Sequence, residues 1–176
     1  MRLSADAPSS SAATGAEAAP ADRAPLKVGL LAGIEAKPEY VQQVERLLTD
    51  AVGLANEEEG TTVWYSFRSG RTSFGIFDAF GGEVDRQAHL HGKIASALTT
   101  RPGLDMLTSH PTIQKVNVLA AKRTPFDGPN PLSVGLLAGI EAKPEYVQQV
   151  KRLLTDAVEL ANEEEGTTVW YSFRSG

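Results

Sequence analysis

One stretch of the chain is present twice. Residues 28–70 recur as residues 134–176. Only two of the 43 positions differ between the copies, as Glu45 and Lys151, and Gly53 and Glu159. Surface positions tolerate change, so this identity indicates a recent or engineered duplication rather than shared structural demands. The second copy stops at the counterpart of Gly70, and the chain therefore holds one complete unit and the first half of another.

Hydrophobic spacing predicts alternating strands and helices in the complete unit. Alternating or β-branched and aromatic runs indicate strands, and apolar residues at three-and-four spacing indicate helices. The expected elements are strands over 27–36, 61–68, 72–80 and 112–121, a helix from 37 to about 56–60, and a helix over 83–98. The second helix is expected to bury a seam of Val84, Ala88, Ala95 and Leu98. Glu57, Glu58 and Glu59 are interpreted as a solvated helix end.

The order βαββαβ predicts an α+β, ferredoxin-like sandwich. In this fold two helices cover one face of a four-stranded antiparallel sheet in the spatial order four, one, three, two. The strand over 72–80 is apolar on both sides, with Phe74 and Ile76 on one and Phe77 and Ala79 on the other. Since an apolar sheet face is rarely left in water, we expect sheet-to-sheet dimerisation.

Composition shifts divide the chain into four parts. Residues 1–24 consist largely of Ala, Ser and Pro and are expected to be a disordered tail. Residues 27–122 form the complete domain, and residues 123–131, rich in proline, form a linker. Residues 132–176 form a truncated second copy with the first strand, first helix and second strand of the domain.

The charge and composition exclude several classes of protein. The net charge is −5, which disfavours a strongly basic nucleic-acid binder, and cysteine is absent, which excludes disulfides and thiolate-held metals. No apolar run approaches the ~20 residues that span a bilayer, and no signal or transit peptide is evident. We expect a cytoplasmic protein that binds neither nucleic acid nor membrane. No spacing of histidines and acids suggests a metal site.

The half repeat allows two nearly equivalent domains. Residues 27–122 give the linear domain, whereas residues 71–176 contain the same elements in circularly permuted order. Alone, the second copy would leave unpaired strand edges. We expect the linear domain to form, with the second copy displaced or completing a sheet in a partner chain as a strand-swapped oligomer. Truncation of a tandem protein would also explain the half repeat.

Three segments carry a family resemblance: EEEGTTVWYSFRSG at residues 57–70, FGIFDAF at 74–80 and DRQAHLHGKIASAL at 85–98. They are similar to the antibiotic biosynthesis monooxygenase family of the dimeric α+β barrel superfamily. Members are small dimeric ferredoxin-like proteins, some of which oxygenate quinol-like or anthrone-like aromatic molecules without metal or organic cofactor. The resemblance covers about residues 27–122 and the duplicated half. It implies a homodimer that needs no cofactor and uses dioxygen.

The resemblance also implies a pocket between sheet and helices. His89 matches a histidine that recurs in the family's second helix, and Asp85 precedes it by four residues on the same helical face. Under this interpretation His89, oriented by Asp85, accepts a substrate proton. Trp64 is favoured as a substrate contact, with Tyr65, on the opposite strand face, as the alternative.

Further substrate-binding residues follow from the same interpretation. Phe77 joins Trp64 as a stacking platform, although both are also candidate core residues, and Arg68 or Arg86 holds a developing oxyanion. Asp78 pairs with one of these arginines or faces solvent at a strand end.

The predicted activity is cofactor-independent monooxygenation of a small aromatic molecule. The alternatives are a non-catalytic small-molecule-binding module and an oligomerisation module of the same fold. Haem degradation is disfavoured, because the first strand lacks the asparagine that haem-degrading relatives use.

Overall fold

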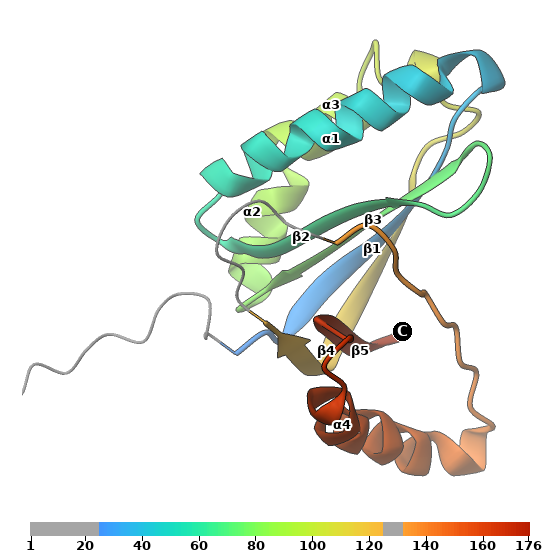
Figure 1. Cartoon of the computed structure of the whole chain (residues 1–176). Helices are drawn as coiled ribbons and strands as arrows, with labels where there is room; N and C mark the ends of the chain where they lie inside the picture. The colour runs from blue at the N-terminus through green and yellow to red at the C-terminus, as the bar shows by residue number, and fades with distance from the viewer. Residues whose placement is uncertain (1–24, 125–131) are drawn as a thin grey trace, which may run out of the picture.

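The computed structural model describes residues 25–124 and 132–176, which form a single antiparallel sheet with helices packed on it (Figure 1). The strands are β1 (Val28–Glu35), β2 (Thr61–Arg68), β3 (Ser73–Phe80), β4 (Thr112–Arg123) and β5 (Val169–Ser175). The helices are α1 (Val41–Glu57), α2 (Glu83–Leu90), α3 (Lys93–Thr99) and α4 (Val147–Glu163), with 3₁₀ turns η2 (Pro38–Tyr40), η3 (Leu104–Met106) and η4 (Pro144–Tyr146). In these parts of the chain no helix is long and apolar enough to cross a membrane.

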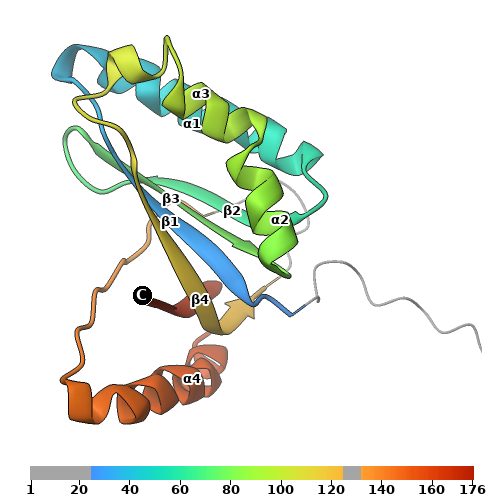
Figure 2. The same cartoon turned by 180° about the vertical axis from the view of Figure 1, so that it is seen from behind.

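The sheet has the order β2-β3-β1-β4-β5. Its first four strands reproduce the predicted ferredoxin-like order, and β5 extends the sheet at the β4 edge. Figures 1 and 2 show α1, α2 and α3 together on one side of the strands. The fold is therefore α+β and ferredoxin-like, with a fifth strand that the four-stranded prediction did not include.

Helix α1 forms where the sequence predicts it. Pro38 sits in the preceding η2 turn, where its missing N–H is not needed, and the helix then buries one apolar stripe against the sheet. The buried residues of the stripe are Val44, Leu48, Ala51 and Ala55. They pack against Ile34, Phe74 and Ile76 of the sheet and Ile94 and Leu98 of α3. This layer is the main hydrophobic core.

The single second helix predicted over 83–98 is wrong in the structure, which breaks it at His91 and Gly92. A Cβ at Gly92 would lie 2.6 Å from Glu58 Oε1 and 3.0 Å from the His89 carbonyl oxygen, so a larger residue here would displace the Glu58 side chain at the end of α1. The predicted seam is also wrong at Val84, which is 82% exposed. The residues that α2 buries are Arg86 and His89.

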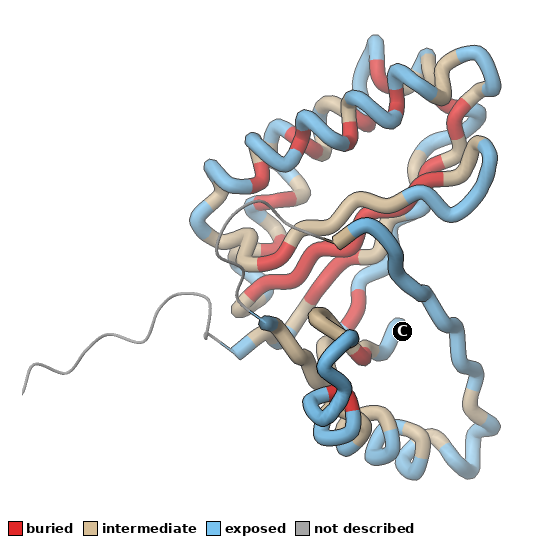
Figure 3. The backbone as a smooth tube through the Cα atoms, in the orientation of Figure 1, coloured by how far each residue is buried: buried red, intermediate tan, exposed pale blue. Residues whose placement is uncertain are grey.

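The second copy forms its helix and its second strand but not its first strand. Residues 132–143 run extended and mostly exposed, whereas β1 of the first copy lies between β3 and β4 (Figure 3). The arrangement is thus the linear one, and not the permuted one. The proposed tail over 1–24 and most of the proposed linker lie outside the described residues, and β4 continues to Arg123, beyond the predicted end of its strand.

The sheet face away from α1 carries a second apolar layer. Val63, Phe77, Ala79 and Val116 are buried there. Phe77 lies 5.1 Å, between ring centroids, from both Tyr171 and Phe173 of β5. The second copy therefore covers part of the face for which the sequence predicts a partner.

Candidate functional site

A buried imidazole lies between two carboxylates on the helix-covered side of the sheet. His89 of α2 is 6% exposed, and its Nδ1 lies 2.6 Å from Glu58 Oε2. Its Nε2 lies 3.1 Å from Oδ2 of Asp78, which is itself buried in β3. Both ring nitrogens are thus held, and the ring orientation is fixed by groups from three separate elements.

Each partner reaches the ring because of its place in the fold. Glu58 follows the last residue of α1, where the chain turns toward β2. Thr61, the first residue of β2, donates its hydroxyl to Glu58 Oε2 at 2.7 Å and lies 3.2 Å from His89 Nδ1. Phe80, at the end of β3, packs on the imidazole with a centroid distance of 5.3 Å. The site is therefore assembled where α1, β2, β3 and α2 converge.

The electrostatics of the cluster favour retention of a proton. Burial of the imidazole lowers its pKa, but the hydrogen bond and charge of Asp78, followed by those of Glu58, outweigh burial, so the pKa of His89 is raised. Burial also raises the pKa of Asp78, and the interactions with His89 offset that rise only in part. The two carboxylates and the imidazole thus act as one proton-holding unit.

A pocket of about 310 Å³ opens beside this cluster. Its polar lining includes Glu58, Thr61, Asp85 and His89, and Leu54 and Ala88 contribute apolar surface. Glu58 is the partner of His89 that lines the pocket, because Asp78 lies beneath the ring in the sheet. A small molecule in the pocket would contact the Glu58 end of the proton-holding unit.

The structure corrects the predicted partner of His89. Asp85 lines the same pocket, but the described polar contacts of the ring nitrogens are to Glu58, Thr61 and Asp78. Asp78, expected to pair with an arginine or face solvent, is buried against His89 instead. Sequence reasoning missed Glu58 because an acidic run at a helix end usually faces water. The following Gly60 lies close to α2, since an added Cβ there would be 2.8 Å from the Asp85 side chain.

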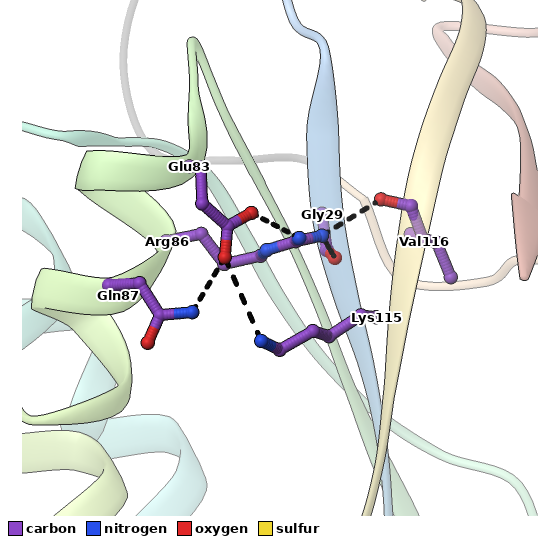
Figure 4. Close-up of polar contacts among 6 residues, drawn as sticks. All are labelled: Gly29, Glu83, Arg86, Gln87, Lys115 and Val116. Carbon is purple, nitrogen blue, oxygen red and sulfur yellow. Dashed lines mark hydrogen bonds and ion pairs between the residues drawn. The ribbon is translucent and has the colours of Figure 1, made fainter. Parts of the chain in front are cut away.

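Arg86 is bound into the sheet and does not line the pocket. Figure 4 shows its guanidinium reaching from α2 to the carbonyl oxygens of Gly29 (3.3 Å) and Val116 (3.2 Å). Its other terminal nitrogen is paired with Glu83, which also accepts a bond from Gln87 and faces Lys115. Arg86 therefore joins α2 to β1 and β4, and the predicted oxyanion-holding role finds no support in its position.

The other predicted substrate contacts are dispersed. Trp64 packs in the core layer under the helices, whereas Phe77 belongs to the layer on the opposite sheet face, so the two rings cannot form one platform. Arg68 lies at the far end of β2 from Thr61 and donates to the carbonyl oxygens of Gly70 and Arg71 in the β2–β3 turn. These three side chains do not gather around His89.

The described residues show no arrangement suited to a metal ion. In residues 25–124 and 132–176, no group of three or more His, Asp or Glu side chains is placed to hold one. In the His89 cluster the imidazole lies between the carboxylates, and each of its nitrogens is bound to an oxygen.

Comparisons with known proteins place this geometry in context. No protein-family model and no curated protein matches the chain. Similar solved structures include an antibiotic biosynthesis monooxygenase (14% identity over 50% of this chain and 94% of that one, TM-score 0.45). Another is a provisionally named antibiotic biosynthesis monooxygenase from Caulobacter crescentus CB15 (15% identity, 51% and 87%, TM-score 0.46).

A third similar structure is much closer in sequence. It is the NE2512 protein of unknown function from Nitrosomonas europaea, with 44% identity over 57% of this chain and 97% of that one, and a TM-score of 0.54. The match spans nearly the whole of that protein. The chain therefore belongs to the family of the Nitrosomonas europaea NE2512 protein, and its structural neighbours include antibiotic biosynthesis monooxygenases.

Proposed function

We propose that the chain is a cofactor-independent monooxygenase that acts on a small aromatic, quinol-like or anthrone-like molecule in the pocket beside Glu58 and His89. The observation that supports this proposal most is the imidazole fixed between two carboxylates, one of which lines a pocket of about 310 Å³. This arrangement can take a proton from a bound molecule and hold it out of water.

The proposed reaction begins with removal of a proton. In neutral His89 the Nε2–H group donates a hydrogen bond to Asp78 and keeps its proton, which leaves Nδ1 as the acceptor, and the substrate proton reaches Nδ1 by way of Glu58. The resulting carbanion or phenolate gives an electron to dioxygen far more readily than its neutral form. Carbon–oxygen bond formation then gives a hydroperoxide, which loses water and leaves a carbonyl group. One oxygen atom enters the product, and the other leaves as water with the two hydrogens of the substrate carbon.

Oxygen uptake by the purified full chain tests the proposal. With an anthrone as the substrate, we expect consumption of one dioxygen per quinone formed, unaffected by a metal chelator. Saturable anthrone binding without oxygen uptake would contradict the proposal and favour the non-catalytic binding module.

The pH dependence of turnover is a further prediction. Turnover is expected to rise with pH as His89 loses its proton, with a midpoint above the ordinary imidazole value of about 6.5, because the two carboxylates raise the pKa of His89. Asp78→Asn removes one of these charges and should move the rising limb of the kcat profile to lower pH. The matched variant Asp85→Asn removes a carboxylate that lines the pocket without contacting the ring, and it should leave the limb nearly in place. An unmoved limb in Asp78→Asn would show that His89 does not set the profile.

A further inference from the structure

A second cavity lies next to the pocket at His89. Its volume is about 300 Å³, and leucine, isoleucine and alanine side chains of α1 and α3 line it. Among its described lining residues Asp50, at the exposed surface of α1, is the one that carries a charge, and none belongs to a strand. The cavity is therefore an apolar groove between two helices and not a continuation of the sheet face.

The groove and the pocket at His89 meet at Leu54, which lines both. On α1 they extend from Leu47 to Glu57, which is roughly 15 Å of helix at 1.5 Å per residue. On the other side α2 contributes His89 and α3 contributes Ala97. Figures 1 and 2 show the α2–α3 pair along α1, so the two cavities form one elongated site with a polar end and an apolar end.

Helix α3 supplies the second wall of the groove. Leu47 and Leu54, seven residues apart on one face of α1, are half-buried against the main core. Their counterparts in α4, Leu153 and Leu160, are 66% and 65% exposed, and Figure 1 shows α4 away from the other helices. The same leucines thus form a groove in the first copy and an open surface in the second.

The charge of the site favours an uncharged ligand. Four carboxylates line the end near His89, and they belong to Glu57, Glu58, Glu59 and Asp85. Lys93, the cation among the described lining residues, is paired with Glu57 at 3.0 Å. A carboxylate on a bound molecule would be repelled at this end and would find no cation in the groove. A hydroxyl group can donate to Glu58, and a hydrocarbon chain is favoured between α1 and α3.

We infer that the groove between α1 and α3 binds a hydrocarbon tail of the substrate, whose hydroxylated ring lies beside Glu58 and His89. The substrate class is then an uncharged alkyl-substituted quinol or phenol. Ala97 determines specificity, because its small side chain leaves room for the tail on the α3 side. The position of the ring rests on the proposed function, whereas binding of the tail can be measured without turnover. Either cavity alone is at the lower limit for a ligand site, and the two together suit a ring with a tail.

Binding of methyl-, butyl- and octylhydroquinone to the full chain under nitrogen tests the inference. Calorimetric titration gives the dissociation constants. Each methylene that enters the groove should lower the dissociation constant by about two- to fourfold. Octanoate carries a negative charge on a similar tail, so it should bind more weakly than octylhydroquinone. Equal constants for the three hydroquinones, or no saturable binding of octylhydroquinone, would overturn the inference.

Filling the groove should remove the effect of the tail and leave binding of the ring unchanged. Ala97→Phe is expected to raise the dissociation constant of octylhydroquinone to near that of methylhydroquinone, whose own constant should stay the same. Ser96→Phe adds the same side chain at the neighbouring exposed position, outside the groove lining, and should keep the dependence on tail length. Ala97→Leu fills less of the groove and should give an intermediate constant. If both Ala97 variants bind octylhydroquinone as tightly as the parent, the tail does not lie in the groove.

Oxygen uptake with the same three hydroquinones separates this inference from the proposed function. Tail-dependent binding that Ala97→Phe abolishes, without oxygen uptake, would support the tail site and contradict monooxygenation. Oxygen uptake with dissociation constants that do not depend on the tail would support monooxygenation and overturn the tail site.

Discussion

Replacement of His89 by Gln is expected to lower kcat for the aromatic substrate by about 10²- to 10⁴-fold, which is the usual contribution of a positioned acid–base group. Glutamine is polar and of similar length, so it can keep a hydrogen bond to Glu58 or Asp78, but it cannot take up a proton. The dissociation constant of the substrate should therefore change little. Oxygen uptake measures kcat, and calorimetric titration under nitrogen measures binding.

His91→Gln is the matched control for this substitution. His91 follows α2, two residues after His89, and its side chain is exposed. The same chemical change at this position should leave both kcat and binding unaltered. Full activity in His89→Gln would refute the proton-acceptor role. A parent chain that binds the substrate without turnover, with the same affinity in both variants, would favour the binding module.

Much of the fold could be predicted because its elements are encoded locally. The three-and-four spacing from Val44 to Ala55 predicts the buried stripe of α1, the β-branched and aromatic run in 61–68 predicts β2, and the run over 72–80 that is apolar on both sides predicts β3; all three elements were confirmed. The second helix was harder. The packing of Glu58 against Gly92 is a long-range contact, so the helix break there was not visible in the spacing of apolar residues.

The candidate site was predicted only in part, for the same physical reason. His89 could be chosen because it matches a histidine that recurs in the second helix of the resembling family, but its partners come from β3 and from the end of α1, far away in sequence. The only carboxylate that helical spacing placed beside it was Asp85. Asp78 gave a usable signal, because a carboxylate inside an apolar strand must find a partner when it is buried.

Replacing one equivalent leucine in each copy is expected to distinguish the linear domain from the permuted one by the loss of stability. Leu48 of α1 is 3% exposed in the main core, and Leu48→Ala should lower the free energy of unfolding by about 2–5 kcal/mol. Its counterpart Leu154 is only half-buried, because α4 covers just β4 and β5, so Leu154→Ala should cost less than about 1 kcal/mol. Urea denaturation measures the free energy of unfolding of both variants. When it is followed by tryptophan fluorescence, a Trp170→Phe background leaves Trp64 as the single tryptophan, so the signal reports on the first copy.

The permuted domain makes the opposite prediction, since residues 134–176 would then form the core and Leu154→Ala would be the costly change. Helix propensity slightly favours the permuted domain. The helix of the second copy has Glu159 where the first copy has Gly53, and this difference stabilises the second helix by roughly 0.5–1 kcal/mol. The linear domain avoids closing the loop between β4 and the copied first strand, which offsets a gain of that size. The gain in helix propensity and the entropy of loop closure are close in magnitude. Whether Leu48→Ala or Leu154→Ala lowers the free energy of unfolding more therefore shows which copy supplies the strand between β3 and β4.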